Sequence, residues 1–165
     1  MKITLKLLTV LFVTLLISCG GKEEQKKEPI SYGKKEVTVK TESAKEKATP
    51  ASKKIDLTNK GVGPISSISL GEIDTAMAAE GEEIFKKMCT ACHRPNKKFI
   101  GPSPQGLLER RSPEWIMNMI LDPEGMVKND PLAKELLIEF NGSPMANQNL
   151  TEKEARAVLE YFRTL

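Results

Sequence analysis

Two cysteines and the only histidine of the chain lie together in the segment Cys89-Thr90-Ala91-Cys92-His93. On one helical turn, this spacing lets both thiols bond the vinyl groups of a haem while the adjacent imidazole reaches the iron. The segment therefore predicts covalent attachment of one c-type haem, with His93 as the proximal iron ligand. A thioredoxin-like redox pair, a structural zinc site and a plain Cys89–Cys92 disulfide use similar residues.

These alternatives fit the rest of the chain less well. A thioredoxin-like pair belongs to a strand–helix–strand setting, whereas the residues around Cys89 show a helical pattern. A structural zinc site needs four ligands, and Cys89, Cys92 and His93 would lack a conventional fourth. A disulfide beside an idle His93 stays open as the plainest alternative.

The second axial ligand cannot be another histidine, because His93 is the only histidine in the chain. Methionine is the leading option. Met126 and Met145 lie in expected loops, 33 and 52 residues after His93. Four more methionines of the domain lie on the haem-bearing helix or within another expected helix, where methionine is more often core filler; they are Met77, Met88, Met117 and Met119.

Capping signals from residue 74 onward predict an all-α domain of about four helices. Each expected helix begins at a residue that can cap it, and apolar residues then recur at three- and four-residue spacing. The helices are expected over residues 75–90 after Asp74, from Ser112-Pro113 to Asp122-Pro123, from Asp130-Pro131 to about residue 140, and after the capping-box pair Thr151 and Glu154.

Further residues around the CxxCH segment follow a known pattern. Gly81 and Phe85 form a GxxxF pattern on the first expected helix, and Tyr161 is an aromatic residue on the last. With these features, residues 75–165 resemble a class I, monohaem cytochrome c domain. In that family the glycine permits close approach of the last helix. The resemblance implies a small class I cytochrome c fold packed around one covalently attached haem c.

The resemblance also implies how the iron is held. Gly101-Pro102 is similar to the family's segment in which the proline carbonyl accepts a hydrogen bond from the proximal imidazole, which fixes its tautomer. The family places its axial methionine before the last helix, where Met145 lies, although the order here is Pro-Met rather than Met-Pro. The resemblance therefore favours Met145 over Met126. Trp115 could meet a haem propionate or pack as an ordinary core residue.

Residues 1–18 have the organisation of an export signal. Lys2 and Lys6 precede an apolar stretch, and Ser18-Cys19-Gly20 follows it. The stretch is too short to span a hydrocarbon core of about 30 Å as a helix. Residues 16–20 resemble a bacterial lipobox, which implies that Cys19 is lipidated and becomes the mature N-terminus. The alternative is a soluble secreted protein with Cys19 lost or free.

Composition separates residues 19–70, a lipidated N-terminus and disordered tether, from a cytochrome c domain over residues 71–165. The tether is rich in Lys, Glu, Ser, Thr and Pro, with no sustained apolar period. Residues 20–70 hold 11 lysines and 7 acidic residues, whereas residues 71–165 hold 12 basic and 15 acidic residues. This mildly acidic domain gives no support to nucleic-acid binding. A short strand near residues 37–39 or 65–70 that docks on the domain is the alternative.

These features predict an electron-transfer protein rather than an enzyme. With histidine and methionine as axial ligands the iron would stay six-coordinate and change oxidation state. We expect single electrons to pass between a respiratory donor and a periplasm-side reductase or oxidase. The alternatives are a haem enzyme or gas sensor with an open axial position, and a fixed subunit of a larger respiratory complex.

We expect the protein in the cell envelope, with its lipid in a bacterial membrane and its domain in the periplasm. Lys22-Glu23-Glu24 resembles a surface-export signal of some lipoproteins, so surface exposure stays open. Basic residues near the haem segment could steer an acidic redox partner: Arg94, Lys97, Lys98, Arg110 and Arg111. The expected apolar shell of the haem comprises Leu107, Leu108, Ile116, Ile120, Leu136 and Leu137.

Overall fold

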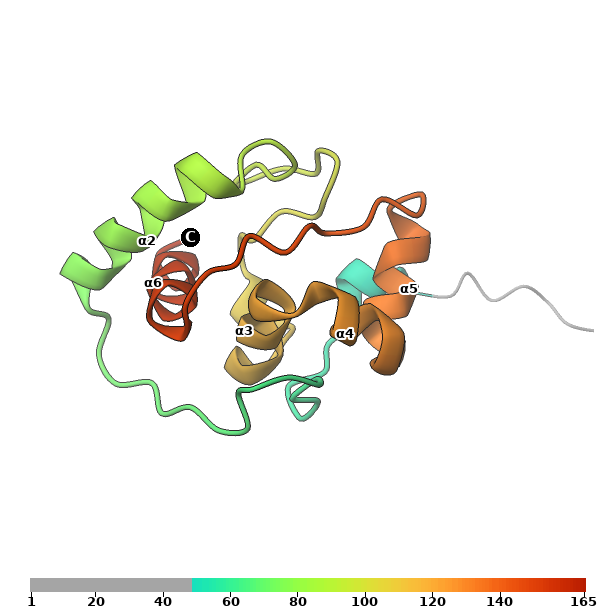
Figure 1. Cartoon of the computed structure of the whole chain (residues 1–165), viewed down its shortest axis with the longest axis horizontal. Coiled ribbons are helices and arrows are strands. Elements are labelled where there is room, and N and C mark those ends of the chain that lie inside the picture. Colours follow the sequence, from blue (N-terminus) through green and yellow to red (C-terminus); the bar gives the residue numbers. More distant parts are fainter. Residues whose placement is uncertain (1–48) are drawn as a thin grey trace, which may run out of the picture. The chain divides into compact units, whose positions relative to one another are not determined.

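Five α-helices and two short 3-10 turns form the part of the chain that the structure, a computed structural model, describes: residues 49–165 (Figure 1). The elements are η1 (Ala51–Lys53), α2 (Thr75–Met88), η2 (Leu107–Glu109), α3 (Pro113–Leu121), α4 (Pro123–Asn129), α5 (Pro131–Glu139) and α6 (Glu152–Phe162). Within residues 49–165 the backbone contributes only isolated bridges and no regular β-strand. The all-α fold class predicted from the sequence is confirmed.

The predictions for the N-terminal segment lie outside the described residues. They concern the signal over residues 1–18, lipidation of Cys19 and the tether up to residue 48. Among the helices that the structure does describe, none combines the length and the apolar character needed to cross a bilayer.

Side-chain caps start the helices where the sequence indicates. The carboxylate of Asp74 accepts hydrogen bonds from the backbone N–H groups of Ala76 and Met77, both at 3.0 Å, and starts α2. At α6, the Thr151 hydroxyl accepts from the N–H of Glu154 at 3.3 Å, and the Glu154 carboxylate accepts from the N–H of Thr151 at 2.8 Å. These caps satisfy N–H groups that have no partner inside the helix.

The structure has one short helix more than the four expected. Asp122-Pro123 ends α3, as the sequence predicts, but the same pair also begins α4. The Asp122 carboxylate accepts a hydrogen bond from the N–H of Gly125 at 2.9 Å, and Pro123 occupies the first helical position. Met126, which the sequence analysis places in a loop, therefore lies on α4.

The first and last helices cross at a glycine. A Cβ on Gly81 of α2 would lie 1.9 Å from the carbonyl oxygen of Ala157 on α6, so no other residue fits this crossing. Phe85, one turn further along α2, packs against Tyr161 with the ring centroids 5.5 Å apart. Figure 1 shows the two helices next to each other. The GxxxF glycine thus has the role that the resemblance implies, and the phenylalanine of the same pattern packs against the aromatic of the last helix.

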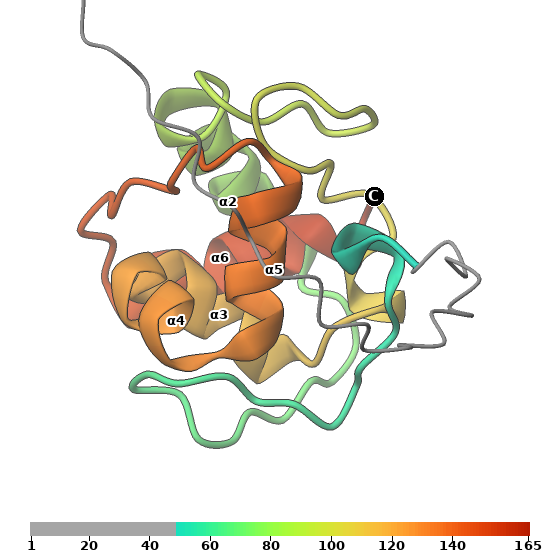
Figure 2. The same cartoon turned by 90° about the vertical axis from the view of Figure 1, so that its right-hand side faces the viewer.

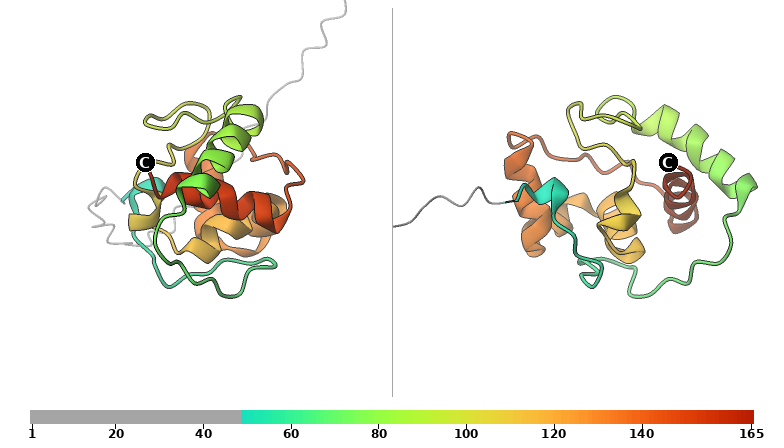
Figure 3. Two further views of the ribbon diagram at one scale, coloured as in Figure 1. Left: turned by 90° about the vertical axis from the view of Figure 1, so that its left-hand side faces the viewer. Right: turned by 180° about the vertical axis from the view of Figure 1, so that it is seen from behind.

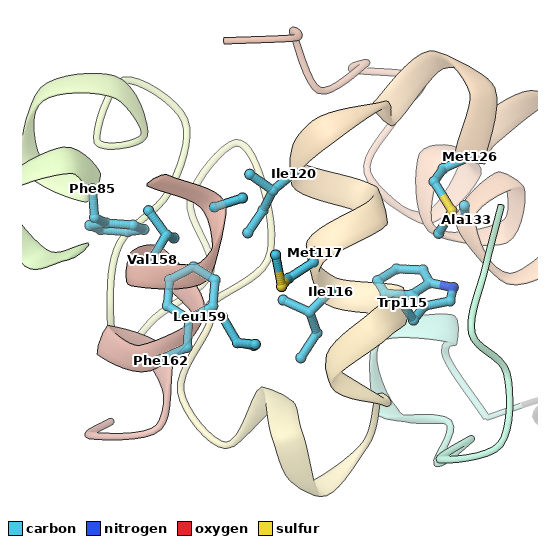
Figure 4. Close-up of a cluster of buried hydrophobic side chains, with 11 residues drawn as sticks. Phe85, Trp115, Ile116, Met117, Ile120, Met126, Ala133, Val158, Leu159 and Phe162 are labelled. Carbon is cyan, nitrogen blue, oxygen red and sulfur yellow. The ribbon is translucent and has the colours of Figure 1, made fainter. Parts of the chain in front are cut away.

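The hydrophobic core joins α2, α3 and α6 (Figure 4). Phe85 of α2 belongs to the same buried cluster as Val158 and Leu159 of α6 and as Ile116 and Ile120 of α3. All five side chains are buried. A large apolar side chain buried in this way contributes about 1.5–3 kcal/mol relative to its exposed form.

A buried carboxylate ties the start of α2 to α6. Glu160 is fully buried, and its carboxylate accepts hydrogen bonds from the Arg163 guanidinium at 2.7 Å and from the N–H of Asp74 at 2.8 Å. Arg156, one turn earlier on α6, forms a second ion pair with it. Burial alone would raise the pKa of Glu160, but these donors outweigh it and hold the pKa below its ordinary value.

Residues 50–68, which we call the N-terminal strap, lie against the helices (Figures 2 and 3). Their composition predicts a disordered tether, so the folded unit begins earlier than predicted. Six polar side chains are buried in the described residues, and five of them bind the strap. These five are Arg111, Ser112, Glu114, Asn118 and Asp130. Because buried polar groups need partners, the strap is part of the fold.

Two buried side chains hold the strap's backbone at four residues. The Asn118 side chain accepts from the N–H of Ile65 at 2.9 Å and donates to the carbonyl of Lys60 at 3.0 Å. The Arg111 guanidinium donates to the carbonyl of Ala51 at 2.6 Å and also to that of Lys54. The structure therefore agrees better with the alternative in which this segment docks on the domain than with a disordered tether. The strap docks without forming a strand.

Candidate functional site

The CxxCH segment continues the last turn of α2. The N–H of Cys92 donates to the carbonyl of Cys89 at 3.1 Å, and the N–H of His93 donates to the same carbonyl at 2.9 Å. Cys89 and Cys92 are not joined by a disulfide. Burial raises the pKa of the Cys89 thiol to about 11. Both sulfurs and the imidazole thus come from one turn at the end of one helix.

A backbone carbonyl holds the imidazole of His93 through its Nδ1 atom. Its Nδ1 lies 2.8 Å from the carbonyl oxygen of Pro102, which can only accept, so Nδ1 carries the proton and Nε2 keeps a free lone pair. A Cβ on Gly101 would lie 2.5 Å from Cε1 of the imidazole. Gly101 therefore allows the chain to pass directly against the ring. The hydrogen bond from the proximal imidazole to the proline carbonyl of the Gly-Pro segment, which the resemblance implies, is therefore present.

A cavity of about 590 Å³ opens beside these residues. Its lining includes Cys89, Cys92, His93 and Met145, which the sequence analysis selects from distant parts of the chain. Five of the six expected shell residues also line it, Leu107, Ile116, Ile120, Leu136 and Leu137. Leu108 does not; it packs against the core cluster instead.

The methionines separate into those at the cavity and those away from it. Met145 is half-buried in the segment between α5 and α6 and lines the cavity. Met126 is fully buried away from the lining, where its sulfur accepts a hydrogen bond from the N–H of Val62 at 3.1 Å. Met119 lines the cavity from α3, although the sequence analysis treats it as core filler. The structure thus leaves Met126 unsuited to bind a group in this cavity.

Trp115 is a core residue. Its side chain is 3% exposed, and its indole N–H donates to the carboxylate of Asp130 at 3.2 Å. Asp130 also caps α5 by accepting from the N–H of Ala133. The indole donor thus already has a partner, which favours the packed-core interpretation. Trp115 also lines the cavity described above, and its contact with a haem propionate stays a prediction.

The basic residues near the motif differ in what they can reach. Arg111 is 2% exposed and holds the strap, and Arg94 donates to the carbonyl of His93 while its guanidinium stacks on the ring of Phe99. Neither faces solvent freely. Lys97 and Lys98 are exposed, and both line the cavity.

One part of the cavity wall was not predicted from the sequence. Pro50, Ser52 and Lys53 of the strap line it, together with Glu139 and Phe140 at the end of α5. These strap residues lie in a polar stretch without apolar periodicity, so no pattern distinguishes them from a tether.

The residues fit one covalently bound haem. The cavity offers two thiols and an imidazole with a free Nε2 on one turn, apolar walls from α3 and α5, and a thioether from the loop before α6. Gly101 provides the clearance that the imidazole needs. A donor set of one imidazole and one thioether is typical of haem iron in electron-transfer proteins.

Comparisons with known proteins agree with this geometry. Residues 78–165 match the family model described as Cytochrome c. The chain belongs to the cytochrome c family. No match was found among curated proteins.

Solved structures extend the match. The chain is similar to cytochrome c from Rhodothermus marinus, with 47% sequence identity, a TM-score of 0.60, and coverage of 62% of this chain and 88% of that one. An engineered form of that protein, Rma TDE, gives 46% identity and a TM-score of 0.59, over 62% of this chain and 89% of that one. The same engineered protein bound to a carbene intermediate gives 46% identity and a TM-score of 0.57, over 62% and 88%.

Family membership establishes the cofactor and the broad activity. Haem c is bound covalently through Cys89 and Cys92, and the domain serves haem-based electron transfer. The fold is that of a small class I cytochrome c. The disulfide, zinc and thioredoxin-like alternatives are therefore set aside.

Proposed function

We propose that this chain is a membrane-anchored monohaem electron carrier whose iron is held by His93 and Met145. The observation that carries the proposal is the cavity, because it gathers both cysteines, the imidazole and the Met145 loop in one place. When bound there, haem supplies an iron centre that exchanges one electron.

Each protein group then has a distinct role. The Pro102 carbonyl orients the imidazole of His93 so that its Nε2 points away from that hydrogen bond and is free to bind. Leu136 and Ile116 exclude water from the cavity and lower its dielectric, which influences the reduction potential. A thioether ligand from Met145 favours ferrous iron and raises the potential.

Met145 is a better ligand than Met119 for a structural reason. Met119 lies inside α3 between Asn118 and Ile120, both of which are buried, so its backbone position is fixed by packing. Met145 comes from an irregular segment whose backbone can adapt to the iron, and that is where the family places its axial methionine. We assign Met119 to the cavity wall.

The redox partner would meet the segment that follows the CxxCH motif. Phe99 and Ile100 are each 46% exposed, next to the exposed Lys97 and Lys98. An apolar patch with a positive rim suits a partner whose docking face is acidic. We propose that this surface receives a respiratory donor and a periplasm-side reductase or oxidase in turn.

We further propose that a lipid on Cys19 anchors the protein in the cell envelope, with the domain in the periplasm. Support comes from the order of Lys2, the apolar stretch and Cys19 in the sequence. Because the strap belongs to the folded unit, a tether is confined to residues 20–48. Cys19→Ala should release the haem protein from the membrane, with an unchanged haem spectrum. Cell fractionation measures this release. Retention in the membrane after normal processing would contradict the anchor.

A second candidate function is chemistry at an open axial position. It is favoured by one observation, the engineered Rhodothermus marinus protein that holds a carbene intermediate. Carbon monoxide distinguishes the two functions, because it binds ferrous haem readily only where a position is open. The reduced wild-type holoprotein should bind carbon monoxide slowly or not at all. Rapid, stoichiometric binding would favour the enzyme or sensor and overturn the electron-carrier proposal.

A further inference from the structure

The strap contacts α5 through one pair of residues at the cavity. Glu139 of α5 is half-buried, and both of its carboxylate oxygens are held by Ser52 of η1. The N–H of Ser52 donates to Oε2 at 2.8 Å, and its hydroxyl donates to Oε1 at 2.6 Å. Both residues line the cavity. Hydrogen bonds to a carboxylate are stronger than those between neutral groups, so this contact fixes η1 against the end of α5.

A second contact near this end of α5, made by the residue directly after η1, is weaker. Lys54 pairs with Glu135, one turn before Glu139, but both side chains are more than 40% exposed. Exposed ion pairs of this kind contribute little to stability. At the start of α5, the Asn59 side chain donates to the N-cap carboxylate of Asp130 at 2.7 Å. The Ser52–Glu139 contact is therefore the principal link between the strap and the C-terminal end of this helix.

The strap is fixed from its other side. Arg111, which is buried at the start of α3, donates to the carbonyls of Ala51 and Lys54, the residues that flank Ser52 and Lys53. The backbone around Ser52 is consequently anchored whether or not Glu139 is present. Ser52 can fix the position of α5 because Arg111 fixes the backbone on both sides of Ser52.

Glu139 lies directly before the segment that carries Met145. It is the last residue of α5, and Met145 follows six residues later. Between them the chain turns through Asn141 and Gly142, whose φ angles are +58° and +71°. The N–H of Gly142 donates to the carbonyl of Leu137 at 2.8 Å, so the turn is attached to the end of α5.

We propose that Ser52 and Glu139 form a latch that positions the Met145 loop over the cavity. They are positioning residues that act through the C-terminal end of α5. The inference rests on the proposed function, in which Met145 binds the iron. Breaking the latch should loosen the loop and make the iron–sulfur bond open more often, while the strap stays docked on α3.

Binding of imidazole to the ferric holoprotein measures this opening, because an added ligand can enter only when Met145 leaves. Glu139→Ala should increase the observed binding rate by roughly 3- to 30-fold, since part of the free energy of two hydrogen bonds to a charged group is lost. Ser52→Ala keeps the backbone N–H donor and should give a smaller increase. Glu139→Gln keeps one acceptor and serves if Glu139→Ala fails to fold.

A matched control separates the latch from general loosening of the strap. Lys60→Gln removes an ion pair of the strap with Glu114 on α3, away from α5, and should leave the imidazole rate unchanged. In the Ser52→Ala/Glu139→Ala double variant the rate should equal that of Glu139→Ala alone, because both substitutions break one contact. Thermal unfolding of each holoprotein shows separately how much global stability changes.

Three results would each overturn the latch. They are an unchanged rate in the folded Glu139 variants, an equal increase in Lys60→Gln, and full additivity in the double variant. Failure of the proposed function looks different. A wild-type ferric protein without a sulfur-to-iron charge-transfer band would show that Met145 is no ligand, before any variant is compared. If the wild-type protein shows the band but the imidazole binding rate does not depend on Ser52 or Glu139, the latch is wrong and the electron-carrier proposal stands.

Discussion

The backbone at Gly101 lies against the imidazole of His93 so closely that a methyl group there would sit 2.5 Å from Cε1. The neighbouring residue, Pro102, supplies the carbonyl that accepts the hydrogen bond from Nδ1–H of His93. One short segment therefore sets both the clearance and the orientation of the proximal imidazole. The Gly-Pro order matters because the first residue must leave room for the imidazole and the next must supply the carbonyl acceptor.

Substitution of Gly101 should disturb the proximal side without changing any ligand. In Gly101→Ala the imidazole or the loop must move, at a cost of about 1–3 kcal/mol, as for other overpacked sites. We expect a lower melting temperature of the holoprotein and a changed ferric spectrum. Gly71→Ala is the control, because a Cβ at Gly71 meets nothing within 4 Å. Identical spectra and stability for the two variants would refute the close contact.

Stability should depend on pH through the buried carboxylate of Glu160. Its pKa is lowered in the folded protein, so its contribution is present above the ordinary value of 4.5 and is lost as pH falls through the folded pKa. Glu160→Gln should cost on the order of 1–3 kcal/mol near neutral pH, and the difference from wild type should shrink towards pH 3. Denaturant unfolding at several pH values measures this. A constant difference across the range would contradict the assignment.

Asn118 should hold the strap on α3. It is 1% exposed and satisfies the backbone of Ile65 and Lys60. Asn118→Leu keeps the branching of the side chain but leaves these groups without partners, at about 1–3 kcal/mol for a buried unsatisfied group. Hydrogen exchange at Ile65 should become faster. Asn129→Ala, which removes a bond only within α4, should leave that amide protected; equal exchange in the two variants would exclude this role of Asn118.

The sequence predicted the helices and the haem-attachment motif well, because both depend on local spacing. Asp74, Ser112 and Thr151 all cap the helices expected of them. The missed helix, α4, shows the limit of this reasoning. Asp122-Pro123 can end one helix and begin the next, and the sequence pattern alone does not say that it does both.

The strap was missed for a different physical reason. It binds mainly through backbone groups that meet Arg111 and Asn118, and such contacts leave no apolar period in the strap's own sequence. The same holds for the pairing of Ser52 with Glu139, which are 87 residues apart. Met126 was misplaced along with α4, and only its burial against the strap removes it as a ligand.

The axial methionine tests the account most directly. If Met145 binds the iron, the ferric wild-type protein should be low-spin with a far-red sulfur-to-iron charge-transfer band. Met145→Ala should abolish the band, open the reduced iron to carbon monoxide and lower the reduction potential, because a ligand that favours ferrous iron is lost. Met119→Leu and Met126→Leu are the controls and should retain the band. A band that survives in Met145→Ala, or disappears only in Met119→Leu, would contradict the assignment.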